Sequence, residues 1–193
     1  MKKIKYILLV AVALLLSNCD TNDDGFYSTV YVNVPHLVSI APHTSNYTVG
    51  EKLYVTADFS RYQDENGKLL DLYKTTGATA FTFSYVIEKQ VAAATWETVF
   101  VNNNLLDVVK GQAENGSFVN GICVYNSTDE TYEYNVGFPL LSAGTYRLSY
   151  GYNSDSTTEV EIRSLSPAKR LTIKINSLLA GIDSEGYYNF TVN

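Results

Sequence analysis

The stretch Ala80-Phe81-Thr82-Phe83-Ser84-Tyr85-Val86-Ile87 decides the fold class of this chain, because bulky apolar side chains alternate in it with smaller ones. Successive side chains of a β-strand point to opposite faces of the sheet. The aromatic and isoleucine side chains of this stretch therefore gather on one face, and the smaller residues lie opposite. This two-residue period predicts a β-strand with one buried face.

The same strand pattern recurs through the rest of the chain. Nine further runs rich in β-branched and aromatic residues are separated by clusters of Gly, Asn, Asp and Pro. Asn66-Gly67 and Asn115-Gly116 suit the positive φ angles of tight turns, whereas residues 104–110 are the best candidate for a short helix. The pattern predicts an all-β fold, a sandwich or a barrel. The nine runs are 29–34, 52–59, 96–101, 121–125, 132–136, 145–152, 158–162, 171–175 and 187–192.

One segment carries a resemblance to a known class of β-sandwich. Leu140-Leu141-Ser142-Ala143-Gly144-Thr145-Tyr146-Arg147-Leu148-Ser149-Tyr150 resembles the E–F corner and F strand of immunoglobulin-like and fibronectin type III-like domains. The resemblance implies that Tyr146 is a structural corner tyrosine, whose hydroxyl returns to the backbone upstream. A similar pattern at 182–192 leaves the strand order open, and the cysteine pair of a true immunoglobulin domain is absent. The expected fold is an immunoglobulin-like β-sandwich, which hosts many unrelated functions.

The N-terminus has the layout of an export signal. Lys2, Lys3 and Lys5 precede an apolar run at 6–16, which is shorter than the roughly 20 residues that span a bilayer. Such a layout is typical of a secretory signal peptide. A plain signal peptide and an N-terminal membrane anchor are both compatible with it.

The residues that follow resemble a bacterial lipobox. Leu16-Ser17-Asn18-Cys19 departs from the usual small residue before the cysteine, a departure that lipoproteins of Bacteroidetes-type bacteria tolerate. The resemblance implies a lipoprotein signal peptide at 1–18 and covalent lipid on Cys19. A flexible acidic tether at 19–27 and a single β-sandwich domain at 28–193 complete the expected organisation.

The acidic tether also indicates a cellular location. Asp20, Asp23 and Asp24 follow the cysteine, and in the resembling lipoproteins a short acidic run at this place directs export to the outer face of the outer membrane. The expected location is therefore the outer membrane, with the protein lipid-anchored and surface-exposed.

Charge and cysteine content exclude several partners. The formal net charge is −6, and loss of residues 1–18 removes three of the fourteen basic residues and leaves −9. A nucleic-acid partner would require clustered Lys and Arg, which the chain lacks. With lipid on Cys19, Cys123 has no disulfide partner within the chain, and its apolar surroundings indicate a buried structural thiol.

The sequence offers little catalytic chemistry. It contains no nucleophile elbow, zinc-protease motif or phosphate loop, so we expect no catalytic residues and no enzyme. His36 and His43 are seven residues apart, which suits ordinary loop histidines better than a metal pair, although a metal or haem site stays open. Asp64, Asn66 and Asp71 offer oxygen ligands around a tight turn and form a possible calcium site.

Tyrosine is the compositional outlier, with sixteen residues in the chain. Strands favour aromatic residues, but exposed tyrosines also anchor glycans and protein partners. The expected function is a non-catalytic binding or adhesion module with an unknown glycan or protein ligand. The alternative is a structural accessory subunit of an outer-membrane assembly, held by edge-strand pairing or a broad interface.

Overall fold

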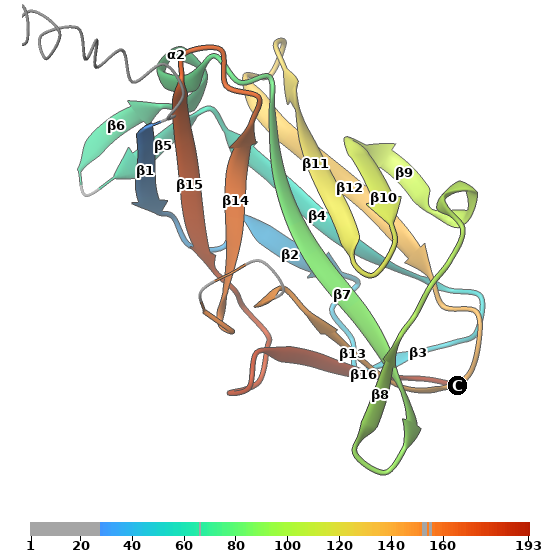
Figure 1. Cartoon of the computed structure of the whole chain (residues 1–193). Helices are drawn as coiled ribbons and strands as arrows, with labels where there is room; N and C mark the ends of the chain where they lie inside the picture. Colours follow the sequence, from blue (N-terminus) through green and yellow to red (C-terminus); the bar gives the residue numbers. More distant parts are fainter. Residues whose placement is uncertain (1–27, 66, 152–153, 155) are drawn as a thin grey trace, which may run out of the picture.

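The structure, a computed structural model, describes residues 28–65, 67–151, 154 and 156–193, and strands make up most of them (Figure 1). The expected signal peptide, Cys19, the acidic tether and Asn66 lie outside the described residues. The strands are β1 (Ser28–Asn33), β2 (Val38–Ala41), β3 (Asn46–Tyr47), β4 (Lys52–Ser60), β5 (Tyr62–Glu65), β6 (Lys68–Asp71), β7 (Ala80–Ala92), β8 (Thr95–Thr98), β9 (Asp107–Lys110), β10 (Gln112–Asn115), β11 (Val119–Asn126), β12 (Thr131–Pro139), β13 (Gly144–Ser149), β14 (Glu159–Leu165), β15 (Leu171–Leu178) and β16 (Tyr187–Val192). A short α-helix, α2 (Leu72–Thr76), and a 3₁₀ turn, η1 (Asn103–Leu105), accompany them.

Strand β7 is the central element of the fold. Phe81, Tyr85 and Ile87 are at most 1% exposed, so the alternation read from the sequence gives the buried face that it predicts. The strand continues to Ala92, well beyond the predicted run, and there it pairs with β8 as a hairpin. The all-β prediction is confirmed.

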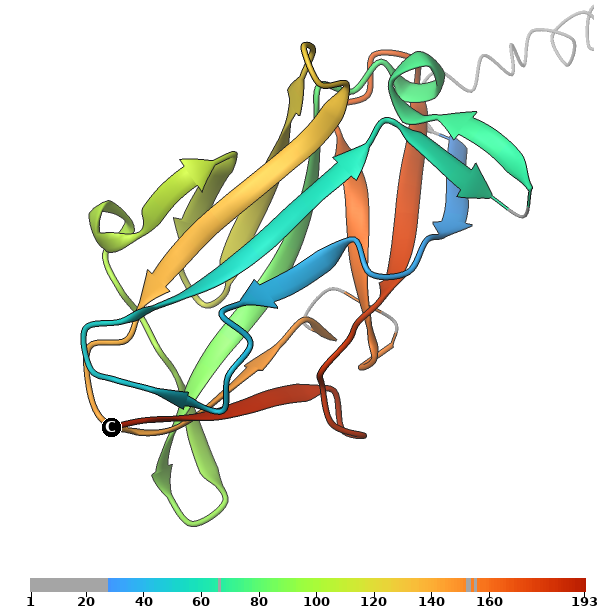
Figure 2. The ribbon, with the colours of Figure 1, turned by 180° about the vertical axis from the view of Figure 1, so that it is seen from behind.

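The main sheet is curled and mixed. Its strand order is β1-β15-β14-β7-β11-β12-β4-β2, and β1 and β2 are consecutive in sequence although they lie at its two ends. The front of the molecule carries β14, β7 and β11, while β4 and β2 cross behind them (Figures 1 and 2). Strand β1 runs parallel to β15, and β3 runs parallel to β16. The core lies between the front and rear parts of the curl.

Strand β7 belongs to two groups of strands. Its first half pairs with β14 and β11, and its second half pairs with β13 and β8. Strand β13 in turn pairs with β16, which also pairs with β3. One long strand therefore connects the main sheet to the smaller group β13-β16-β3.

Residues 104–110, the best candidate for a short helix, do not form an α-helix. The chain forms η1 there and then β9, whose Val108 and Asp107 pair with Val136 and Gly137 of β12. The carboxylate of Asp107 accepts hydrogen bonds from Lys52 and from the Tyr54 hydroxyl, both at 2.7 Å. Pairing with a distant strand has overridden a weak local helix signal.

Seven of the thirteen tyrosines that the structure describes are buried inside the molecule. The hydroxyls of Tyr85 and Tyr134 are hydrogen-bonded to each other at 3.0 Å within the core. Cys123 is fully buried, as expected, and burial raises the pKa of its thiol. Tyrosines that are at most 3% exposed are Tyr47, Tyr85, Tyr132, Tyr134, Tyr146, Tyr150 and Tyr188.

Candidate ligand-binding groove

A groove runs along the outward face of β7. Because side chains alternate, Thr82, Ser84, Val86 and Glu88 point away from the core side of this strand, and all four border hollows in the surface. One hollow, of about 400 Å³, lies among β7, β10, β11 and β14. A second, of about 310 Å³, lies among β7, β8, β13 and β16.

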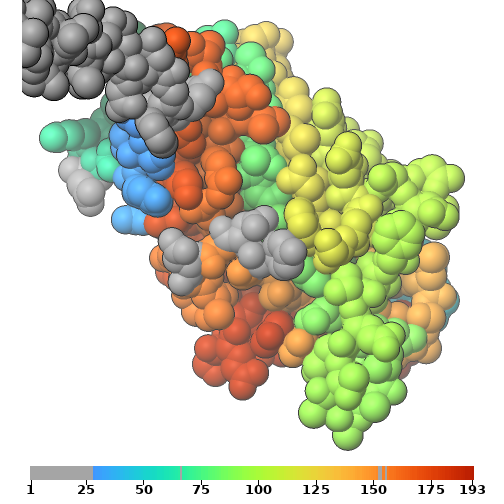
Figure 3. Space-filling view, viewed as in Figure 1, coloured from blue at the N-terminus to red at the C-terminus, as the bar shows by residue number. Residues whose placement is uncertain are grey.

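The hollows join into one surface feature. A small hollow beside the β10–β11 turn shares Glu114 and Phe118 with the first and Ser117 with the second. Another hollow shares Ser149 and Tyr187 with the second. Figure 3 shows part of the groove between the orange atoms of β14 and the yellow atoms of β10 and β11, with green atoms of β7 set back between them.

Strand pairing explains why the surface is hollowed here. Strand β14 pairs with β7 at residues 80–82, and β13 pairs with β7 at residues 86–89. The groove opens where the first pairing ends and the second begins. Its floor is the side-chain face of β7, and its walls are the neighbouring strands that leave β7 in different directions.

The upper part of the groove contains a buried carboxylate. The side chain of Glu161 is only 6% exposed, and it lies 2.6 Å from Arg163 Nη2 and 3.2 Å from Lys174 Nζ. Arg163 and Lys174 face each other across β14 and β15. The two cations compensate the buried negative charge, which would otherwise be costly to remove from water.

At the lower end of the groove three side chains stack, and we call them the stacked platform: Trp96, Arg147 and Tyr187. Arg147 and Tyr187 border the second hollow, and Trp96 packs against Arg147 beside it. The Arg147 guanidinium lies 4.3 Å from the Trp96 ring centroid and 4.0 Å from the Tyr187 ring centroid. Its Nε donates to Glu88 at 2.7 Å. Four strands (β7, β8, β13 and β16) supply these four residues, so the platform depends on the tertiary fold.

A tight turn positions Tyr187 in this stack. The carboxylate of Asp183 accepts hydrogen bonds from the backbone N–H groups of Tyr187 and Glu185, both at 2.9 Å, and from Asn189 at 2.6 Å. These hydrogen bonds, that from Tyr187 above all, hold the pKa of Asp183 below its ordinary value. The turn thereby fixes the start of β16 and the ring that begins it.

The lining of the groove is about half polar and half apolar, and its polar groups combine both hydrogen-bonding roles. The second hollow is bordered by the hydroxyl residues Thr98, Ser117 and Ser149, together with Glu88 and Arg147. Hydroxyls donate and accept, whereas the carboxylate accepts and the guanidinium donates. Such a lining suits the binding of a polar ligand, and the neighbouring aromatic rings add apolar faces.

The stacked platform lies far from the point where the described chain begins. Ser28 bonds to the backbone of Arg170 in the β14–β15 turn, next to the start of β7, where Ala80 pairs with Leu165. Trp96 pairs with Gln90 near the other end of β7. Ten residues of strand span about 33 Å, so the platform and Ser28 occupy opposite ends of the molecule (Figure 1).

The residues of the possible calcium site lie elsewhere, at the β5–β6 hairpin. Asp64 accepts from the Gly67 N–H at 2.7 Å, and Asn66 is outside the described residues. Asp71 has partners for both oxygens, namely Arg61 at 2.6 Å and the Lys74 N–H at 2.9 Å. Within the described ranges no three His, Cys, Asp or Glu side chains form a group that could hold a metal ion. The calcium site stays a prediction.

The structure also shows the contacts of the corner tyrosine and the positions of the two histidines. The Tyr146 hydroxyl donates to the Ser142 carbonyl at 2.7 Å, four residues upstream. In the similar pattern at 182–192, the Tyr188 hydroxyl bonds instead to the distant Thr44. His43 packs against the Tyr188 ring at 5.1 Å, and His36 lies in a turn with a φ of 61°.

Sequence reasoning did not find the groove residues. Arg147 lies in the corner segment, Tyr187 lies in the run at 187–192, and Glu88 follows directly after the run at 80–87, and none of the three gives a chemical signal in the sequence. The available hint was Trp96, which is the only tryptophan of the chain. In the part of the chain that the structure describes, no helix is long and apolar enough to cross a bilayer.

Comparison with known proteins gives no family. No family model matches the sequence, and no curated protein matches it either. Among solved structures, the chain is similar to the crystal structure of the human F-spondin reeler domain (fragment 1), with 11% sequence identity and a TM-score of 0.37. The match covers 90% of this chain and 99% of that chain. A likeness at this level shows neither a family nor a function.

Proposed function

We propose that this protein is a lipid-anchored lipoprotein of the outer membrane that binds a ligand in the groove along β7, without catalysis. The single observation that supports the binding role is the groove, lined by polar and charged side chains beside apolar ones, with the stacked platform at the end remote from Ser28. A tether that joins Ser28 to a lipidated Cys19 would leave that end facing away from the membrane. The ligand would then meet the platform first.

The anchor follows from the lipobox resemblance. Each buried acyl CH₂ contributes about 0.8 kcal/mol, so one chain binds reversibly and two or three chains hold a protein firmly. The acidic residues after Cys19 support export to the cell surface. We also propose that the sandwich is of the immunoglobulin-like type, and the hydrogen bond from Tyr146 to the Ser142 carbonyl supports this.

The anchor is tested by comparing the two cysteines. Cells that produce the full chain are labelled with a clickable palmitate analogue, and the chain is recovered and probed for the label. Cys19→Ala should abolish labelling, whereas Cys123→Ala should leave it unchanged. Protease added to intact cells should degrade the labelled chain if it is surface-exposed. Labelling that survives Cys19→Ala would contradict the anchor.

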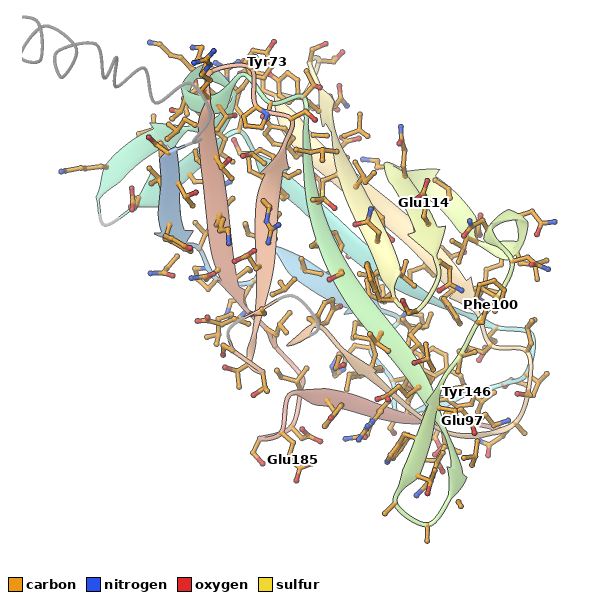
Figure 4. The ribbon with its side chains drawn as sticks, in the orientation of Figure 1. Tyr73, Glu97, Phe100, Glu114, Tyr146 and Glu185 are labelled. Carbon is orange, nitrogen blue, oxygen red and sulfur yellow. The ribbon has the colours of Figure 1, made fainter. Side chains whose placement is uncertain are left out.

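The binding role is tested with a photo-crosslinking amino acid on β8. Thr98 borders the groove and is exposed, whereas its neighbour Glu97, labelled in Figure 4, points to the opposite side of the same strand. Irradiation of intact cells should give a crosslinked product from position 98 and little from position 97. Equal capture from both positions, or capture from position 97 alone, would contradict binding in the groove.

A second candidate function is an accessory subunit of an outer-membrane assembly. Among the described strands, β1 pairs only with β15, and its Val30 and Tyr31 are 39% and 55% exposed. An edge strand of this kind can accept a strand from a partner. A crosslinker at Tyr31 that captures one envelope protein in stoichiometric amount, with none captured at Thr98, would favour this candidate.

A further inference from the structure

We infer that the groove binds a neutral oligosaccharide and that one sugar ring packs against the stacked platform of Trp96, Arg147 and Tyr187. The inference rests on the proposed binding role and adds the chemical class of the ligand. It follows from three properties of the groove: the pairing of all its cations with carboxylates, its aromatic faces and the nature of its floor.

The ionised side chains of the groove compensate one another. Arg147 pairs with Glu88, and Glu161 pairs with Arg163 and Lys174. Glu114, on the opposite wall, and Glu185, beside the hollow next to Tyr187, add two more negative charges (Figure 4). Four carboxylates therefore accompany three cations, and each of these cations already has an anionic partner.

This arrangement of charges disfavours an acidic ligand. A carboxylate or phosphate group would find every groove cation already paired and four carboxylates nearby, which would repel it. A neutral sugar hydroxyl can donate to a carboxylate and accept from a guanidinium at the same time. Paired charges thus supply strong hydrogen-bonding groups to a neutral polyol without leaving an uncompensated charge.

The platform provides the apolar part of the recognition. A sugar ring has a face of C–H groups and an edge of hydroxyls, so it packs on an aromatic ring and hydrogen-bonds at its rim. Trp96 and Tyr187 are half-buried, and the guanidinium between them contacts both rings. Since these side chains are already ordered, binding loses little side-chain entropy.

The floor of the groove distinguishes a sugar chain from a peptide. An extended peptide that joins a sheet needs the N–H and C=O groups of a strand edge. The groove instead presents the side-chain face of β7, which includes the Thr82 hydroxyl. The Asn120 amide of β11 and the Ser149 hydroxyl of β13 lie beside it. The joined hollows are open along the strand, which suits several linked sugar units.

Trp96 makes the inference directly measurable. As the only tryptophan of the full chain, it reports ligand binding at the platform by its fluorescence. The full chain in detergent is titrated with neutral hexasaccharides of α- and β-linked glucan, mannan, xylan and galactan, and with oligogalacturonate of equal length. At least one neutral chain should shift the emission to shorter wavelength in a saturable way, and it should bind more tightly than oligogalacturonate.

Matched variants locate the site. Trp96→Ala, followed by calorimetry, and Tyr187→Ala should each weaken the neutral ligand by about tenfold or more, the equivalent of about 1.4 kcal/mol. Trp96→Phe should retain most of the affinity because it keeps an aromatic face. Phe100→Ala removes an aromatic side chain that is 64% exposed and belongs neither to the stacked platform nor to the lining of these hollows, and it should leave the affinity unchanged.

Two results would overturn the inference. Tighter binding of oligogalacturonate than of any neutral chain would contradict the charge argument, and failure of every saccharide to shift Trp96 would exclude this ligand class. In the second case, capture from Thr98 but not Glu97 in intact cells would show that the groove binds another partner. The proposed binding function would then stand without the oligosaccharide inference. Absence of both the Trp96 fluorescence shift and the crosslink from position 98 would contradict the binding function and the inference alike.

Discussion

Two buried tyrosines should respond in opposite directions to the same chemical change. The Tyr150 hydroxyl is buried and has no hydrogen-bond partner among the described residues. The Tyr134 hydroxyl is equally buried but bonds to the Tyr85 hydroxyl at 3.0 Å. Replacing each with phenylalanine removes one oxygen atom from the same kind of ring in the same core.

The structure gives the size of each effect. A buried hydroxyl without a partner costs about 1–3 kcal/mol in protein mutational data, and the small void left after its removal offsets part of this. Tyr150→Phe should therefore raise the free energy of unfolding by about 1 kcal/mol. Tyr134→Phe should lower it by about 1–2 kcal/mol, because it leaves the Tyr85 hydroxyl buried and unpaired.

Urea unfolding of the full chain and the two variants, followed by circular dichroism, measures both values. The midpoints should shift in opposite directions at an unchanged slope, since neither variant alters the surface exposed on unfolding. If Tyr150→Phe lowers the free energy of unfolding by more than about 0.5 kcal/mol, its hydroxyl has a partner such as a buried water. The reasoning about the tyrosine core would then be refuted.

Three further predictions concern the corner, a tight backbone contact and the turn beside the platform. Tyr146→Phe loses the hydrogen bond to the Ser142 carbonyl and should lower the free energy of unfolding by about 1 kcal/mol. Tyr31→Phe, at an exposed ring, should change it little. Equal effects of the two substitutions in urea unfolding would contradict the structural role of the corner tyrosine. Gly111 has a φ of 74°, and a Cβ there would lie 2.5 Å from the Ile122 carbonyl oxygen. Gly111→Ala should therefore lower the free energy of unfolding by about 2 kcal/mol or more in the same assay. Gly116→Ala, with open space around its Cβ, should change it by less than about 0.5 kcal/mol. The pKa of Asp183 is lowered in the folded chain by backbone hydrogen bonds. Its contribution to stability is therefore complete above the unfolded value of about 3.9 and is lost as the pH falls through the lower folded value. Asp183→Asn should remove this part of the acid sensitivity in unfolding curves recorded from pH 6 to pH 2, and an unchanged pH dependence would contradict the assignment.

The strands were predictable because their signal is local. The alternation at 80–87 needs only neighbouring residues to be recognised, and β7 forms there. The runs at 52–59 and 187–192 match β4 and β16 for the same reason. The helix interpretation of residues 104–110 failed because β9 forms there by pairing with β12, more than twenty residues away in sequence.

The groove was not predictable because its chemistry depends on strand order. Glu88, Trp96, Arg147 and Tyr187 come from four strands, and the repeated corner pattern left that order open. Once β13 lies between β7 and β16, the register brings Arg147 opposite Glu88 and Asn189. The tyrosine count indicated aromatic packing, but it could not say which rings are buried and which line a surface.

The most direct test of the central claim is whether the stacked platform is occupied on the cell. Hydroxyl-radical footprinting with mass spectrometry compares the oxidation of Trp96 and Tyr187 in intact cells with that in the purified full chain. The exposed Phe100 and Tyr73, which lie outside the groove, serve as internal references. We predict that Trp96 and Tyr187 are protected in cells while the references are oxidised equally in both samples. Equal oxidation of Trp96 in cells and in the purified chain would contradict a ligand-binding role for the groove.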